Sequence, residues 1–451
     1  MRRETSMRIK VASKVHILKG ILFLAILGLL SGCFAVDSQK DPQELIQSSG
    51  KVKVLLAASQ NRYYGYSAQS FFTKMYSEPF QSIHSDIQIE LISLDKVKKN
   101  PSGELDLETI RQLIADEHPD LIYMNSSQYE QLTTDNKLTL LDANIEQGEF
   151  DMNAFYPPVL EALNRGGYYG LSPSFDSLAL FYNKSIFDSK SIAYPKEGMT
   201  WEEWFRLVAQ FSVHEADKAR IYGIYQPPYS RLSGLELIRF IGESMGLPKW
   251  KEESDADMNE WIPLLDRFAS LYHSGSIAPP EARQLAVSAS DHGNDKFMQG
   301  AAAMTFAGSD FFRNLLDVRR DREAFNDWGV VSLPILADNP KQTLGFTAYE
   351  IYGIPLGAKK SAAAWQLIQY ICGDDRAKLA MEPPFRYFSS NRKQWQTINL
   401  APFTELIPDK TKSFFNSAEV TSHQEEQHAL EAIKEEGNGW SLLSLFRNSY
   451  R

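Results

Sequence analysis

The stretch Leu107–Met124, LETIRQLIADEHPDLIYM, predicts a helix that is followed at once by a strand. Apolar residues recur at helical spacing over 107–117, and the apolar run over 120–124 is typical of a buried strand. Strand patterns also lie at 51–57 and 87–94. This order predicts an α/β fold with a mainly parallel sheet covered by helices, in which ligands bind at the loops that leave the carboxyl ends of the strands. We therefore expect the loops 63–66 and 125–128 to lie near a ligand.

Length and composition indicate a large globular protein. The chain has 451 residues, enough for about three domain-sized units, and its 43% hydrophobic, 23% charged and 12% aromatic residues argue against disorder and against a multi-span membrane protein. The net charge of −10, without a basic stripe, argues against binding of nucleic acid. Two cysteines exclude a disulfide scaffold and a zinc site of four thiolates. No P-loop and no H-E-x-x-H pattern is present, so we expect no metal and no cofactor.

The N-terminus has the order of a secretory signal: basic residues, an apolar run over 21–30, and the small residues Ser31 and Gly32 before Cys33. The apolar run is shorter than the ~20 residues that a membrane-spanning helix needs. The junction Leu30–Cys33 resembles the bacterial lipobox, in which the cysteine is lipidated and becomes the first residue of the mature protein. We therefore expect a signal peptide over 1–32, a palmitate-type lipid anchor on Cys33, and a polar tether over 33–50. This predicts a body held at the extracytoplasmic face of the cell membrane.

Further local patterns predict individual elements. Thr200-Trp-Glu-Glu203 has the pattern of a capping box, which predicts a helix that begins at Thr200. Apolar residues from Leu235 onward have helical spacing, and Gly246 can end that helix in a left-handed conformation. We also expect strands at 301–306, 328–334 and 351–355, a helix over 362–372 in which Cys372 is a buried structural thiol, and a mostly helical remainder.

Five motifs stand out together, at 119–123, 169–184, 194–203, 300–304 and 359–365. In their order and spacing they resemble the family 1 extracellular solute-binding proteins of ABC importers. The resemblance spans about residues 51–375, behind the lipobox, and implies a periplasmic-binding-protein type II fold: two α/β lobes with a hinged cleft between them that closes on a solute.

The resemblance also implies where the chain passes between the lobes. In the family the passages correspond to Phe175–Ser177, Phe306–Ser309 and Tyr349–Tyr352 of this sequence. Carried over, they divide the chain into lobe 1, residues 51–175 plus 309–352, and lobe 2, residues 177–308 plus 353–451. Each lobe is then discontinuous in the sequence.

Two segments resemble ligand-binding stretches of maltose-binding protein, a member of this family. Residues 175–183 resemble a segment whose acidic residue faces the sugar, which implies that Asp176 contacts the ligand; a turn or hinge cap is the alternative interpretation. A carboxylate accepts strong hydrogen bonds from hydroxyl groups. Residues 226–229 resemble a second segment, which implies ligand contact by Tyr229, with Tyr225 and Gln226 beside it. Tyrosine rings can stack on sugar faces while their hydroxyls form hydrogen bonds.

Other candidates rest on position alone. Ser126 and Ser127 follow the strand 120–124 and can exchange hydrogen bonds with a ligand. Tyr63 and Tyr64 follow the first strand, where aromatic residues lie as often at the edge of the core as beside a ligand.

The later segments carry the same ambiguity. Phe346, Thr347 and Tyr349 are either ligand contacts or core. Asp310 stands where the family has a stacking tryptophan, which weakens maltodextrin as the ligand. Asp310 would also permit a cationic ligand such as a polyamine or an amino sugar.

Two alternative functions have some support in the sequence. Gly242-Glu-Ser244-Met-Gly246 matches the G-x-S-x-G pattern of serine hydrolases, but its serine ends a helical pattern, whereas a hydrolase places it on a turn between strand and helix. A lipoprotein that presents its ligand to a surface sensor is left open.

The sequence thus predicts a monomeric, lipid-anchored solute-binding protein that performs no chemistry. Its expected partners are a small polar solute, above all an oligosaccharide, and the permease subunits of an ABC importer.

Overall fold

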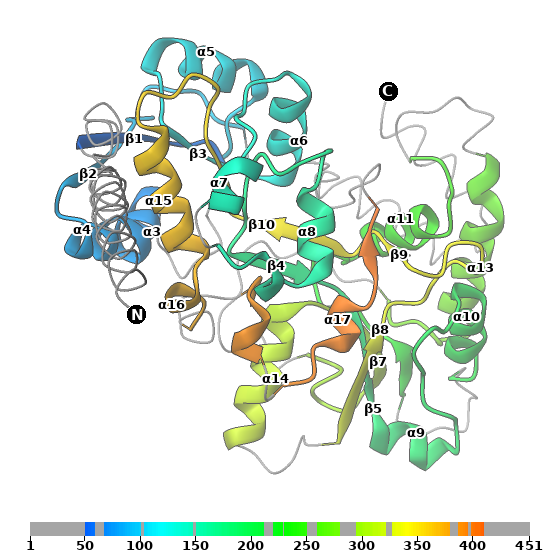
Figure 1. Ribbon diagram of the computed structural model, residues 1–451. Coiled ribbons are helices and arrows are strands. Elements are labelled where there is room, and N and C mark those ends of the chain that lie inside the picture. Colours follow the sequence, from blue (N-terminus) through cyan, green and yellow to red (C-terminus); the bar gives the residue numbers. More distant parts are fainter. Residues whose placement is uncertain are drawn as a thin grey trace, which may run out of the picture. The chain divides into compact units, whose positions relative to one another are not determined.

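The computed structural model describes residues 50–58, 67–100, 103–147, 150–211, 220–228, 230–249, 259–279, 295–321, 327–378, 387–395 and 398–409. From Lys51 onward, the described residues belong to one compact unit. Their strands form two four-stranded sheets, a three-stranded sheet and a strand pair, with helices between them (Figure 1). The expected signal peptide, Cys33 and almost all of the tether lie outside the described residues.

The first sheet has the strand order β11-β3-β1-β2. β1 (Gly50–Leu56) and β3 (Leu121–Met124) run parallel, β11 (Ile351–Gly353) is antiparallel to β3, and α5 (Leu107–Glu117) connects β2 (Ile87–Leu91) to β3. The carboxylate of Asp120 accepts hydrogen bonds from the backbone N–H groups of Lys53 and Lys360, at 3.0 and 2.9 Å. It thereby ties the segment before α15 (Ser361–Cys372) to this sheet.

The second sheet has the strand order β6-β7-β5-β8. β6 (Tyr222–Ile224) and β7 (Ala302–Ala307) are parallel, whereas β5 (Ala179–Asn183) is antiparallel to both β7 and β8 (Trp328–Ser332). The helix α10 (Trp201–Ala209) begins at the predicted residue. Thr200 accepts from the Glu203 N–H, and the Glu203 carboxylate accepts from the Thr200 N–H at 2.8 Å, so the predicted capping box is confirmed.

A three-stranded antiparallel sheet, β10 (Phe346–Tyr349), β4 (Ser174–Ser177) and β12 (Phe388–Ser389), is called the connecting sheet below. β4 leads directly into β5 of the second sheet, and β10 leads directly into β11 of the first sheet. These two strands lie where the sequence placed passages near 175–177 and 349–352. Figure 1 shows β4 and β10 side by side.

The remaining elements are short or cover the sheets. α6 (Ser126–Thr134) follows β3, α11 (Leu235–Ser244) and α13 (Ile262–His273) pack against each other, and α14 (Ser309–Asp321) follows β7. The others are α3 (Ala68–Phe72), a π-helical turn (Thr73–Ser77), α4 (Glu78–Ile83), α7 (Asp142–Gln147), α8 (Pro157–Leu163), α9 (Lys184–Lys190), α16 (Asp374–Ala377), α17 (Ala401–Thr404), the 3-10 turns Met152–Ala154, Asn259–Trp261 and Arg392–Trp395, and the paired strands β9 (Gln342–Thr343) and β13 (Ile407–Pro408).

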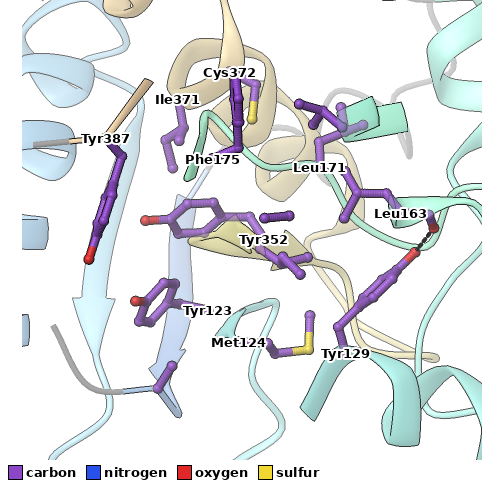
Figure 2. Close-up of a cluster of buried hydrophobic side chains, with 14 of the residues drawn as sticks. Tyr123, Met124, Tyr129, Leu163, Leu171, Phe175, Tyr352, Ile371, Cys372 and Tyr387 are labelled. Carbon is purple, nitrogen blue, oxygen red and sulfur yellow. Dashed lines mark hydrogen bonds between the residues drawn. The ribbon is translucent and has the colours of Figure 1, made fainter. Parts of the chain in front are cut away.

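Two hydrophobic clusters form the core. One contains side chains of the first sheet, the connecting sheet and α15; Figure 2 shows part of it, with the Tyr129 hydroxyl donating to the Leu163 carbonyl at 2.6 Å. The other contains side chains of the second sheet with α10, α11 and α13. The first cluster also contains Ala179 and Phe181 of β5, whereas Leu180 and Tyr182 of the same strand belong to the second, so the two faces of β5 pack in different clusters.

Three expectations differ from the structure. The second sheet is mixed rather than mainly parallel, because β5 is antiparallel to both β7 and β8; in the first sheet β1 and β3 are parallel as expected, and β11 enters antiparallel to β3. The expected division placed 309–352 with lobe 1 and 353–451 with lobe 2, but β8 pairs with β5 in the second sheet, and the backbone just before α15 donates to Asp120 beside β3 of the first. The chain therefore stays with the second sheet beyond the passage expected near Phe306–Ser309. The described part of 374–409 consists of short helices, turns and strands rather than mostly helix.

Other local predictions are confirmed. Cys372 is a buried free thiol on α15, and burial raises its pKa well above the ordinary value. Gly246 has φ = 90° just after α11. Ser244 lies in the last turn of that helix, and a Cβ at Gly242 would stand 2.1 Å from the ring of Trp261, so both residues belong to helix packing rather than to a hydrolase turn. In the described ranges, no helix is both long enough and apolar enough to cross a membrane.

Candidate functional site

The connecting sheet has one polar and one apolar face. In the β10–β4 register, Thr347 lies opposite Asp176, and Tyr349 lies opposite Ser174. Directly opposed residues of an antiparallel pair share a face, and successive residues alternate between faces. Ser174, Asp176, Thr347 and Tyr349 therefore lie together on one face of the sheet, which we call the polar face.

The other face packs into the core. Phe346 stacks on Phe175 with ring centroids 5.3 Å apart and an interplanar angle of 16°, and Phe388 of β12 lies 5.4 Å from Phe175. The structure thus places the candidate Phe346 in core packing, with its side chain buried. This apolar anchor fixes the orientation of the strands and so determines which side chains the opposite face presents.

Asp176 is half-buried at the centre of the polar face. Its Oδ1 accepts a hydrogen bond from the backbone N–H of Ser309 at 2.8 Å, at the start of α14. A Cβ at Gly308 would stand 2.4 Å from the same oxygen, so only glycine allows the chain to approach the carboxylate this closely. This hydrogen bond fits the alternative interpretation of Asp176 as a cap, and the remaining lone pairs of the carboxylate can still accept hydrogen bonds from a ligand.

Buried hydroxyls without a hydrogen-bond partner lie on and beside this face. Ser174 Oγ and Thr347 Oγ1 are on it, in residues that are each 8% exposed, and Ser309 Oγ, in a residue that is 0% exposed, follows Gly308. None of these oxygens has a partner among the described residues. A buried polar group without a partner costs about 1–3 kcal/mol, and a bound polar molecule can remove that cost.

An arginine and two tyrosines border the polar face. Tyr349 stacks on Tyr387 with centroids 4.0 Å apart and an angle of 11°, and the guanidinium carbon of Arg231 lies 5.1 Å from the centre of the Tyr349 ring. Burial by itself would lower the pKa of Arg231, but the two tyrosines and Asp176 outweigh it and raise that pKa above its ordinary value. Arg231 therefore carries a positive charge beside the polar face.

The other predicted residues are spread around this region. Tyr225 is buried, with the Lys296 ammonium 4.7 Å from its ring centre. In the orientation that satisfies both of its polar atoms, the Gln226 amide accepts from the Phe306 N–H at 2.8 Å and donates to the Phe306 carbonyl at 3.1 Å. Gln226 therefore hydrogen-bonds to the backbone of β7. Tyr229, Tyr63 and Tyr64 lie outside the described residues.

Two further candidates lie at helix starts. Ser126, the first residue of α6, donates to the Ala348 carbonyl at 3.0 Å and so joins that helix to β10. Ser127 is exposed. Asp310 is half-buried on the first turn of α14, one residue after Ser309.

Sequence reasoning missed Ser174, Arg231 and Tyr387. The signal for Ser174 was its place two residues before Asp176, on the same face of a strand. Arg231 follows the candidate Tyr229 by two residues in the sequence. The sequence held no local signal for Tyr387. Among the described residues, no cluster of His, Cys, Asp and Glu side chains could hold a metal ion.

Two mixed β-sheets with helices packed around them, joined by an antiparallel pair of extended strands, define the periplasmic-binding-protein type II fold. A family model described as bacterial extracellular solute-binding protein matches residues 78–400, and the chain belongs to that family. It is therefore an extracytoplasmic solute-binding protein and not an enzyme. A search of curated protein sequences finds no match.

Solved structures of the same fold agree with this assignment. An extracellular solute-binding protein family 1 from Alicyclobacillus acidocaldarius has 13% identity and a TM-score of 0.59, covering 89% of this chain and 98% of that one. The sugar-binding protein MalE of Xanthomonas citri has 15% identity and a TM-score of 0.58, covering 88% and 96%. An ABC substrate-binding protein of Listeria monocytogenes in complex with cycloalternan has 16% identity and a TM-score of 0.52, covering 88% and 97%.

Proposed function

We propose that this chain is a lipid-anchored binding protein that captures a small polar solute, above all an oligosaccharide, and delivers it to an ABC importer. The polar face of the connecting sheet is the observation that carries the proposal. There a half-buried carboxylate lies among hydroxyls that are buried without a partner. A ligand rich in hydroxyl groups can donate to Asp176 and can pair with Ser174 and Thr347 at the same time.

The mechanism rests on two lobes, one built on each four-stranded sheet. β4 and β10 are the chain passages between them, so small changes in their backbone angles would change the angle between the lobes. When the lobes close, the polar groups of the site and those of the solute would leave water together. A solute that does not match the site would then leave some of these groups without a hydrogen-bond partner. The importer would recognise the closed form.

The structural neighbours favour a sugar as the solute. One is a sugar-binding protein, and another was solved with the oligosaccharide cycloalternan. This chain has no described tyrosine that is free to act as a sugar platform on the polar face, because Tyr349 already packs on Tyr387. Hydrogen bonds from the polar face, rather than stacking on Tyr349, would then provide most of the recognition.

A thermal-shift screen of the full chain in detergent, against oligosaccharides, sugar acids, polyamines and peptides, tests this function. A solute at 100 times its dissociation constant adds about 2.7 kcal/mol to the free energy of unfolding. We expect an oligosaccharide to raise the midpoint and Asp176→Ala to abolish the shift. Asp116→Ala, an exposed aspartate on α5, is the matched control and should retain it. A shift that survives Asp176→Ala would show that the solute binds elsewhere.

The lipid anchor has a separate test. We expect the chain expressed in a bacterium to incorporate labelled palmitate and to partition with membranes, and Cys33→Ser to abolish both. Cys372→Ser is the control, since that thiol is buried within α15. Unchanged labelling of the Cys33→Ser chain would refute the anchor without bearing on solute binding.

A further inference from the structure

The Tyr349 ring packs against a second aromatic ring and a cation. Tyr387 stacks on it at 4.0 Å, and the Arg231 guanidinium lies 5.1 Å from its centre. Attraction between a guanidinium and an aromatic ring stabilises such an arrangement. Because Tyr349 belongs to β10 and Arg231 to the loop before α11, the ring holds the cation at a defined place beside the connecting sheet.

That place is next to Asp176. Tyr349 lies two residues from Thr347, and Thr347 lies opposite Asp176 on the same face. Diagonal neighbours on a sheet face are about 7–8 Å apart, which is within reach of an arginine side chain. The attraction between Arg231 and Asp176 is also among the causes that raise the pKa of Arg231.

Charges of both signs lie beside the polar face. Arg231 and Asp176 contribute one of each sign, and α14 carries Asp310 and Arg313, of which Arg313 donates to the Tyr387 carbonyl at 2.9 Å. Because Arg231 offsets the charge of Asp176, a cationic solute enclosed beside this pair would leave its own charge without a counter-charge from the pair, which is costly. An uncharged solute would not meet this cost.

We propose, on the basis of the function proposed above, that Arg231 is a specificity-determining residue that offsets Asp176 and makes the site reject amine-bearing solutes in favour of uncharged, hydroxylated ones. A hydroxyl group both donates and accepts, so a diol can bridge a guanidinium and a carboxylate. An ammonium group can only donate, and it would face Arg231 at close range. The acidic composition of the chain alone would have favoured a cationic solute instead.

The test compares the full-length wild type with Arg231→Gln and Arg231→Lys, using spermidine as a fixed probe in titration calorimetry. We expect Arg231→Gln to bind spermidine at least about tenfold more tightly than wild type and Arg231→Lys do, equivalent to about 1.4 kcal/mol. Adding Asp176→Asn to Arg231→Gln should abolish this gain. Arg267→Gln is the matched control, because Arg267 also lies over an aromatic ring, Phe205, and pairs with a carboxylate, Glu202.

The experiments distinguish a failure of the role of Arg231 from a failure of the proposed function. Spermidine binding that is equal in wild type and Arg231→Gln, or that is gained equally by Arg267→Gln, would overturn the role of Arg231. Failure of every solute to bind wild type in the thermal-shift screen would overturn the proposed function, whereas the spermidine comparison would still decide whether Arg231 offsets Asp176. A double-mutant cycle of Arg231→Gln and Asp176→Asn in thermal unfolding adds a measurement without ligand: non-additive midpoints support the pairing, and additive midpoints contradict it.

Discussion

Replacing Tyr76 by phenylalanine removes one hydroxyl from a buried polar contact next to the connecting sheet. Tyr76 and Glu350 are each 2% exposed, and the hydroxyl donates to the Glu350 carboxylate at 2.6 Å. Glu350 stands between β10 and β11 with φ = 58°, an unusual backbone conformation for a residue other than glycine. Tyr352 supplies a second, longer hydrogen bond at 3.3 Å. Burial and the nearby carboxylate raise the pKa of Tyr76 well above its ordinary value, so it remains a donor at neutral pH.

The magnitude follows from these contacts. A hydrogen bond to a charged group contributes about 1.5–3 kcal/mol, and Tyr352 can compensate only in part because its hydroxyl is farther away. We expect Tyr76→Phe to lower the free energy of unfolding by roughly 2 kcal/mol. An unfolding entropy near 2.1 cal/mol/K per residue amounts to about 0.8 kcal/mol/K for about 400 residues, so the thermal midpoint should fall by roughly 2–3 °C.

Scanning calorimetry of the ligand-free chain measures this change. Tyr272→Phe is the control, because burial alone raises the pKa of Tyr272 and no acceptor contributes. We expect the control to alter the midpoint by much less than Tyr76→Phe does. Equal midpoints for wild type and Tyr76→Phe would refute the reasoning, since they would mean that the Glu350 carboxyl does not depend on this donor.

Three other predictions concern stability and reactivity. Burial raises the pKa of Tyr129 to about 12, so this tyrosine should contribute stability that is present below pH ~10 and lost as the pH rises through 12, amounting to roughly 3 kcal/mol; urea midpoints of wild type should fall over this range, and those of Tyr129→Phe should fall less. Thr200→Ala removes the cap of α10 and should lower the free energy of unfolding by about 1 kcal/mol in urea titrations. Cys372 should react with a soluble disulfide reagent only after denaturation, because the thiol is buried and its pKa is raised.

Each of these predictions has a contrary outcome. Identical pH dependence of wild type and Tyr129→Phe would show that the phenol ionises freely in the folded chain. A Thr200→Ala variant as stable as wild type would mean that α10 does not need its capping box. Rapid labelling of the native Cys372 thiol would place it at an accessible surface.

Local elements could be predicted because their causes are local. The capping box at Thr200 lies within four consecutive residues, and the side chain and backbone that satisfy each other are both in that segment. The end of α11 at Gly246 and the buried position of Cys372 on α15 follow equally from the spacing of apolar residues along each helix. The strand–helix–strand order around α5 likewise required no knowledge of distant segments.

The candidate site could be predicted only in part. Asp176 was identified through a resemblance, and the structure places it at the centre of the polar face. Phe346 was equally plausible by position, yet it stacks on Phe175 in the core. The sequence of β10 alone does not show which of its two alternating sets of side chains faces the core, because that depends on the register with β4.

The amino-acid sequence by itself determined the α/β character of the chain, the boundaries of its well-capped helices, and the family to which it belongs. Tertiary structure alone decided that β8 joins the second sheet while α15 packs with the first, and that Arg231, Tyr349 and Tyr387 meet beside Asp176. The physical reason is the distance along the chain over which each kind of interaction acts. Helix caps and periodicity act over a few residues, whereas strand register and charge pairing join residues that are tens to hundreds of positions apart, and their energies arise only when the chain has folded.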